Sequence, residues 1–182
     1  MTVTHAKVEV VDYDELCQLT PAALATLRAA FVGRSAFGIV GVRGAPGYDV
    51  ARREAFRTAV ELAVHDEAGR ERCAAVRQTY PGWNGTPGTE THPLQSNFLH
   101  NIKEGVGARP AVDPYFGENR WPDARMKRDF TALNAAMYPA SLAVMRGCDA
   151  LLREALGDAV DGRPSFEQIG EGGTTLAGRW IW

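Results

Sequence analysis

Residues 31–47 read FVGRSAFGIVGVRGAPG, and a helical pattern continues from there to Val64. Gly33 predicts the end of a preceding helix, and the apolar run 37–42 predicts a buried strand. The glycines and the proline of residues 44–47 predict a turn. Helix, strand, turn and helix follow one another with almost no spare residues, which predicts a compact fold containing both helices and strands.

The helix after this turn is predicted to have Asp49 as its N-cap and to carry one apolar side. The stripe that it is predicted to bury consists of Phe56, Val60, Ala63 and Val64. The charged residues predicted to lie mostly outside that stripe are Arg52, Arg53, Arg57 and Glu61.

The composition is that of an ordinary globular protein, with 182 residues, 45% hydrophobic and 23% charged. A formal charge of -2 gives no reason to expect binding to nucleic acid or to an anionic membrane. The three cysteines are far apart and form no Cys-x-x-Cys pair, which argues against a zinc site or a disulfide framework. The start of the chain lacks the apolar run of a leader, and no segment is apolar enough to span a bilayer, so we predict a cytoplasmic protein.

Further elements are predicted on both sides of the opening stretch. A first strand is expected at residues 7–11, and Thr20-Pro21 predicts a helix start with threonine as N-cap. Residues 79–119 are rich in glycine, proline and aromatic residues, which predicts a long ordered loop with one or two short strands, including one near residues 96–101. A final strand is expected within residues 174–182.

A long helix is predicted to begin at Trp121-Pro122. The residues of its apolar face are Met126, Phe130, Leu133, Met137, Leu142, Met145, Leu152 and Leu156. Pro139 is predicted to kink this helix or to split it in two. The chain is therefore predicted to be a single α+β domain over residues 1–182, with short strands, two N-terminal helices, a long ordered loop and a long C-terminal helix or helix pair.

The four histidines do not form a recognisable metal-binding motif. Non-haem iron oxygenases hold iron with two histidines and one carboxylate, usually in the pattern His-x-Asp with a second histidine downstream. Only His65-Asp66-Glu67 comes close, and it is predicted to lie within a helix. Side chains two residues apart on a helix point about 200° apart, so His65 and Glu67 cannot easily hold one ion. A surface histidine is the simpler interpretation.

Five segments resemble the N-terminal region of the iron(II)/2-oxoglutarate-dependent oxygenases related to isopenicillin N synthase. Residues 31–47 resemble the opening of that region, and residues 76–83 resemble the segment after its second helix. Residues 96–104 resemble its short site-facing strand, and residues 119–122 (Asn-Arg-Trp-Pro) resemble the start of its long helix. Residues 177–179 resemble the start of a strand that normally continues Arg-Leu-Leu-His-Tyr. The resemblance thus covers nearly the whole chain, but only the N-terminal part of the family.

The resemblance implies a complete enzyme that uses iron(II) and 2-oxoglutarate to oxidise a small molecule. It implies substrate-binding roles for Arg77, Tyr80, Ser96 and Phe98. Arg77 would pair with a substrate carboxylate, and Ser96 would donate a hydrogen bond. The alternatives are an exposed cation at a helix end for Arg77, a polar strand residue for Ser96, and core or lid packing for Phe98.

The chain departs from the family pattern after Arg179, where it reads Trp180-Ile181-Trp182. The resemblance therefore implies a product truncated after residue 179, without the iron ligands, that binds no iron tightly and is inactive alone. A terminal strand of this kind leaves apolar surface and unpaired backbone groups, so residues 174–182 are a predicted site of self-association or partner binding.

Three interpretations of function stay open. The first is the substrate-side portion of an oxygenase, and the second is a stand-alone small-molecule-binding or protein-interaction module derived from that family. The third is an enzyme of unrelated chemistry that uses the loop of residues 79–119.

Overall fold

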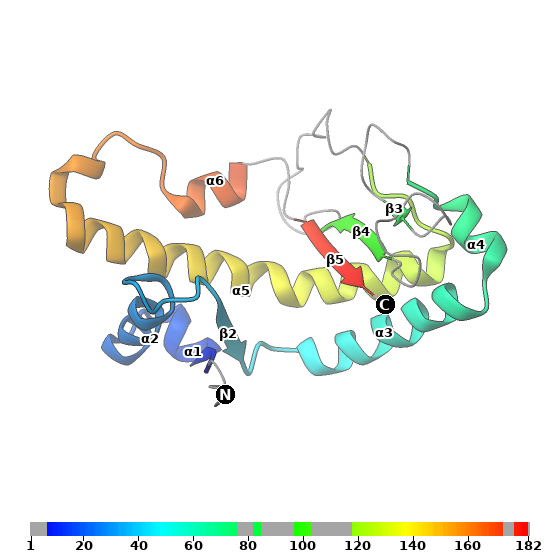
Figure 1. Ribbon diagram of the computed structural model, residues 1–182, viewed down its shortest axis with the longest axis horizontal. Coiled ribbons are helices and arrows are strands. Elements are labelled where there is room, and N and C mark those ends of the chain that lie inside the picture. Colours follow the sequence, from blue (N-terminus) through cyan, green and yellow to red (C-terminus); the bar gives the residue numbers. More distant parts are fainter. Residues whose placement is uncertain (1–6, 76–81, 85–96, 103–117, 173–176, 182) are drawn as a thin grey trace, which may run out of the picture. The chain divides into compact units, whose positions relative to one another are not determined.

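The computed structural model of the chain describes residues 7–75, 82–84, 97–102, 118–172 and 177–181 (Figure 1). This part of the chain contains both helices and short strands, so the predicted α+β class is confirmed. The chain divides into two compact units, which are described separately: residues 1–46 with 139–171, and residues 47–138 with 172–182. The expectation of a single domain stays a prediction.

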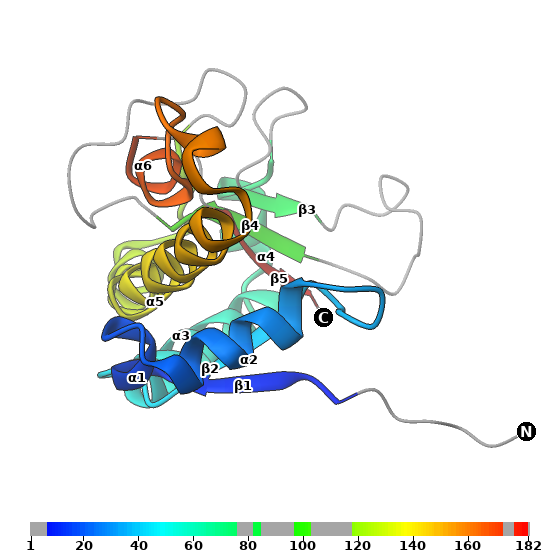
Figure 2. The same ribbon diagram turned by 90° about the vertical axis from the view of Figure 1, so that its left-hand side faces the viewer.

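The first unit is built on two short parallel strands and the helices that follow them. Its elements are β1 (Glu9–Asp12), α1 (Tyr13–Cys17), α2 (Pro21–Phe31), β2 (Val40–Arg43), the second half of α5 (Ala124–Leu156), the 3₁₀ helix η1 (Gly157–Val160) and most of α6 (Phe166–Gly172). The helix start predicted at Thr20-Pro21 is confirmed, because the Thr20 side chain accepts a hydrogen bond from the Ala23 backbone nitrogen at 3.2 Å. Helix α2 packs against β1 (Figure 2).

Strands β1 and β2 pair in parallel, with Glu9 opposite Val40 and Asp12 opposite Arg43. At that last pair the Arg43 guanidinium donates two hydrogen bonds to the Asp12 carboxylate, at 2.8 and 2.9 Å. These bonds hold the pKa of Asp12 below its usual value. The core of this unit consists of Val11, Leu16, Ala23, Leu27, Ala143 and Leu151.

Strand β2 begins at Val40 rather than at residue 37, so the predicted buried strand 37–42 is only partly correct. Phe37 and Ile39 are 60% and 59% exposed. The physical reason lies in the loop before the strand, where Gly33 and Gly38 have φ angles of 105° and 69°. A backbone in that region of φ cannot continue a strand.

The second unit combines helices with a three-stranded antiparallel sheet. Its elements are α3 (Tyr48–Val64), α4 (Glu67–Arg72), β3 (Gly82–Asn84), β4 (Asn97–Asn101), the first half of α5 and β5 (Ala177–Ile181). The sheet order is β3-β4-β5, with Trp83 opposite Phe98 in the first pair and Asn97 opposite Ile181 in the second. The strands expected near residues 96–101 and within 174–182 are therefore confirmed.

Helix α3 buries a different face from the one predicted. Its buried residues are Ala55, Thr58, Ala59 and Leu62. Phe56, Val60 and Val64 are 38%, 46% and 62% exposed, so the predicted buried stripe is wrong for these three residues. The small side chains of the buried alanines allow α3 to lie close to the core. The Thr58 hydroxyl donates a hydrogen bond to the buried carboxylate of Asp129. The helix also begins earlier than predicted, with Gly47 as its N-cap at a φ of 73°.

Helix α5 is one continuous helix of 33 residues with Pro139 inside it, so the alternative of two separate helices is wrong. The predicted apolar face holds in its first half, where Met126, Phe130 and Leu133 are fully buried. Towards the end it fails, because Leu151 is buried while the predicted Leu152 and Leu156 are 36% and 53% exposed. No helix in the described part of the chain is both long and apolar enough to cross a bilayer.

We expect Gly82→Ala to destabilise the second unit strongly. Gly82 has a φ of 118°, and a β-carbon there would lie 2.2 Å from the Cys73 carbonyl oxygen. The φ strain alone costs about 1–3 kcal/mol, and the clash with backbone adds to it. Urea denaturation measures the loss, with Gly162→Ala as control, because Gly162 has a φ of 74° but open space around it. Equal losses for the two variants would contradict the clash.

We expect the three cysteines to react at different rates with a thiol reagent at pH 8. Cys73 is fully buried, and burial raises the pKa of its thiol to about 11. Cys148 is half-buried, with its thiol pKa raised mainly by burial, whereas Cys17 is exposed. Because the thiolate is the reactive form, alkylation followed by peptide mass spectrometry should mark Cys17 first and Cys73 last. All three should react alike in urea, and rapid native labelling of Cys73 would contradict the core described above.

Candidate functional site

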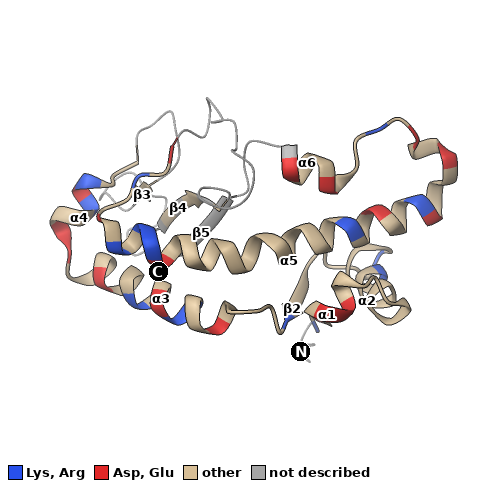
Figure 3. Cartoon of the chain, turned by 180° about the vertical axis from the view of Figure 1, so that it is seen from behind, with Lys and Arg blue, Asp and Glu red and all other residues tan. Residues whose placement is uncertain are grey.

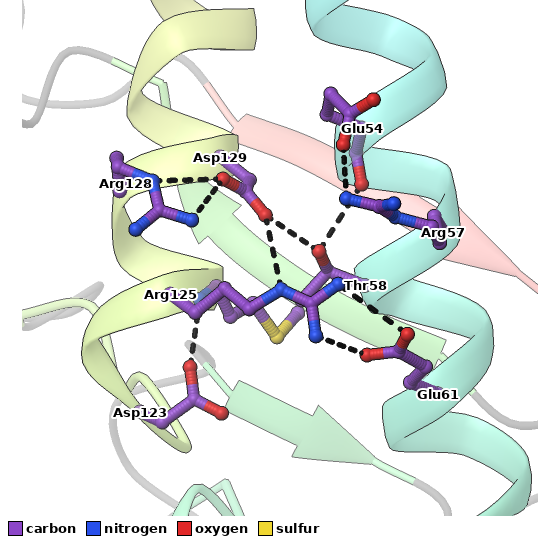
Figure 4. Close-up of polar contacts among 9 residues, drawn as sticks. Glu54, Arg57, Thr58, Glu61, Asp123, Arg125, Arg128 and Asp129 are labelled. Carbon is purple, nitrogen blue, oxygen red and sulfur yellow. Dashed lines mark hydrogen bonds and ion pairs between the residues drawn. The ribbon is translucent and has the colours of Figure 1, made fainter.

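A buried carboxylate lies between α3 and the first half of α5 (Figure 4). Asp129 is only 8% exposed, and one of its oxygens accepts a hydrogen bond from the Thr58 hydroxyl at 2.7 Å. Its other oxygen accepts from the Arg128 guanidinium, with nitrogen–oxygen distances of 3.0 and 3.1 Å. A buried charge is tolerated only with such partners, and the bond from Thr58 is the one that joins α3 to α5.

Arg125 extends this arrangement towards solvent. Its guanidinium donates to both oxygens of Glu61, at 2.6 and 3.3 Å, and its Nε lies 3.8 Å from Asp129. Hydrogen bonding to Glu61 raises the pKa of Arg125 further above its usual value. We call Thr58, Glu61, Arg125, Arg128 and Asp129 the Asp129 cluster.

A pocket of about 400 Å³ lies beside the Asp129 cluster. It is formed by the end of α3, the turn into α4 and the start of α5. Its lining residues are Thr58, Glu61, Leu62, His65, Asp66, Pro122, Asp123 and Met126. The apolar residues and the three carboxylates make it a pocket with negative charge at its walls, a chemistry suited to a cation.

The pocket's carboxylates all have structural partners. Asp66 accepts from the Gly69 backbone nitrogen at 2.7 Å and thereby caps α4. Asp123 accepts from the Met126 backbone nitrogen at 2.7 Å at the start of α5 (Figure 4). Aspartate is a preferred residue at such helix starts because its oxygen satisfies a free backbone N–H. These residues are therefore explained by helix capping, and we assign no ligand to the pocket.

The residues around His65 are arranged differently from the prediction. His65 is the C-cap of α3, Asp66 is the N-cap of α4, and Glu67 is the first residue of α4. The expectation that all three lie in one helix is wrong, because a turn separates the two helices. His65 is exposed, as the simpler interpretation of a surface histidine has it.

The described residues do not offer a site for iron(II). Within residues 7–75, 82–84, 97–102, 118–172 and 177–181, no group of three His, Cys, Asp or Glu side chains is placed to hold a metal ion. The cofactors implied by the resemblance therefore find no ligand set there.

Three of the four predicted substrate-binding residues, Arg77, Tyr80 and Ser96, lie outside the described residues. Phe98 lies on β4 and is fully buried. Its ring centroid lies 5.6 Å from Trp121 and 5.7 Å from Phe130. This packing agrees with the alternative of a core residue, and a substrate-binding role for Phe98 stays a prediction.

The sequence reasoning missed two buried polar pairs. One is the bond between Thr58 and Asp129 described above. The other joins His100 on β4 to Asn134 on α5, with 2.8 Å between Nε2 and Oδ1. A signal was present, because Asp129 and Asn134 lie beside Phe130 and Leu133 on the apolar face of the long helix. Polar residues at such positions indicate buried hydrogen bonds.

Neither a scan against protein-family models nor a search of curated proteins finds a match for this chain. The oxygenase resemblance therefore rests on the segments quoted above.

We expect Thr58→Val to lower the free energy of unfolding by about 1.5–3 kcal/mol, because it removes a hydrogen bond to a buried charged group. The matched control is Thr26→Val, since the Thr26 hydroxyl donates to the Ala22 carbonyl at 3.0 Å on an exposed helix surface. Urea denaturation of both variants makes the comparison. Losses of equal size would contradict the special role of the Asp129 cluster.

Proposed function

We propose that this chain is the N-terminal, substrate-side portion of an iron(II)- and 2-oxoglutarate-dependent oxygenase that acts on a small molecule. The observation that carries the proposal is the pairing of β4 with β5. Strand β4 contains the segment that resembles the site-facing strand of the family. Strand β5 begins with the Ala-Gly-Arg segment that resembles the strand leading to Arg-Leu-Leu-His-Tyr.

These two segments are far apart in the sequence, yet they are hydrogen-bonded neighbours in one sheet. They run antiparallel, with Leu99 opposite Arg179 and Asn101 opposite Ala177. Each segment alone is a weak motif, but a local sequence pattern does not dictate which distant strand it pairs with. Their pairing supports a common role for the two segments at one site.

In this proposal the chain binds and orients the substrate. Arg77 pairs with a substrate carboxylate, Ser96 donates a hydrogen bond, and Tyr80 and Phe98 shape the apolar side of the pocket. Iron(II) and 2-oxoglutarate would supply the oxidising chemistry in the complete enzyme. Among the described residues no group of three potential ligands is placed to hold a metal ion, and the sequence has no His-x-Asp, so no step of the oxidation is assigned to this chain.

The mass of the native product in its source cells tests the proposal. An antibody against residues 96–104 would isolate that product for intact mass spectrometry. We expect a mass clearly above the 19.8 kDa of this sequence, with added sequence that contains His-x-Asp and a distant second histidine. The recombinant 182-residue chain, isolated with the same antibody, is the control for proteolysis.

Anaerobic mixing with iron(II) and 2-oxoglutarate gives an independent readout. The longer product should form a stoichiometric iron–oxoglutarate absorption band, and the 182-residue chain should form none. A native product of 19.8 kDa, or added sequence without the iron motif, would contradict the proposal. A native product of 19.8 kDa would make the stand-alone binding module derived from the same family the better explanation.

A further inference from the structure

We propose that the exposed side of α3 is a docking surface for an amphipathic, acidic helix of a partner protein. We call this surface the α3 outer face, and its residues are Val50, Arg52, Arg53, Phe56, Arg57, Val60 and Val64. It faces away from the Asp129 cluster, and the inference does not depend on the proposed oxygenase function.

The apolar residues of the α3 outer face lie on one side of the helix, with Arg53 and Arg57 between them. Val50, Val60 and Val64 are 63%, 46% and 62% exposed, and Phe56 is 38% exposed. At about 100° per residue, the four positions fall within a sector of about 120°. Phe56, Val60 and Val64 are spaced by four, which makes the kind of ridge that packs into the groove of another helix.

Helix propensity does not account for these residues. Valine is a poorer helix former than alanine, lysine or glutamate, which are the residues favoured on a solvated helix face. The buried side of α3 is already complete with alanines, Thr58 and Leu62. The helix therefore carries two apolar sides, of which only one is used by the core of this unit.

The charges on the α3 outer face indicate the chemistry of the occupant. Basic and acidic positions both occur along α3 (Figure 3). The Arg52 guanidinium lies 4.6 Å from the centre of the Phe56 ring, and Arg57 pairs with Glu54 (Figure 4). Arg53 has no ion pair with any of the described residues. Arg53 falls among the apolar residues of this face. A partner that covers the face must therefore place a carboxylate beside its apolar side chains to pair with Arg53. Asp49, at the first turn, is the one acidic residue in that sector.

A helical protein segment fits this pattern better than a membrane or a second copy. Arg53 and Arg57 lie among the apolar residues rather than beside them, so insertion into a bilayer would bury both guanidinium groups. A second α3 outer face would bring arginines against arginines. An acidic amphipathic helix supplies both an apolar groove and carboxylates.

The test uses two synthetic helical peptides as long as α3, which has 17 residues. Both carry the same leucine face; glutamates flank it in one peptide and lysines replace them in the other. Titration into the ¹⁵N-labelled chain should give saturable shifts at Val50, Val60 and Val64 with the glutamate peptide, weakening as salt rises. The lysine peptide should give none.

Variants assign the binding to this face. Val60→Asp should weaken binding of the glutamate peptide by about tenfold or more. Arg53→Glu should weaken it as well and should favour the lysine peptide. The matched control is Ile169→Asp, because Ile169 is a similarly exposed apolar residue (52%) on helix α6. Circular dichroism should show that all three variants keep their helices.

Several outcomes would overturn the inference. These are equal binding of both peptides, shifts that spare α3, or binding to phosphatidylglycerol vesicles in place of the peptide. Concentration-dependent dimerisation that Val60→Asp abolishes would identify a second copy as the occupant. Loss of peptide binding in a longer native product would show that the face is covered within the same chain.

Discussion

The buried carboxylate of Asp129 is the constraint on which the second unit depends. A carboxyl group with 8% exposure needs partners that replace water, and here they are the Thr58 hydroxyl and the Arg128 guanidinium. Because Thr58 must face α5, the alanines at positions 55 and 59 face the core with it. The bulkier Phe56, Val60 and Val64 are then directed to the opposite side. One polar requirement thus determines both the packing of α3 and its exposed apolar face.

The strand pairing of the second unit is a different kind of constraint. Strand β4 lies between β3 and β5, so a segment from the middle of the chain is held by residues 177–181. The proposed function rests on that pairing, whereas the proposed docking surface rests on α3. The two proposals use different residues and different measurements, and either can fail without the other.

The pocket beside the Asp129 cluster shows why acidic residues alone are a poor guide to function. Asp66 and Asp123 each accept a backbone N–H at a helix start, and Glu61 is paired with Arg125. Capping and ion pairing explain all three carboxylates. A ligand would have to compete with these bonds, and helix starts lose stability when their caps are removed.

The sequence by itself determined the local structure: the α+β class, the helix start at Thr20-Pro21, the buried Met126, Phe130 and Leu133, and the strand within residues 97–101. These follow from capping, hydrophobic spacing and turn residues, which act over a few positions. Only the tertiary structure decided which face of α3 is buried, that Pro139 lies within one helix, and that Phe98 packs on Trp121. Those outcomes depend on residues distant in sequence. A buried polar group must form hydrogen bonds with whichever residues the fold brings beside it, and a strand pairs with whichever segment the fold places at its edge. Apolar periodicity carries neither kind of information.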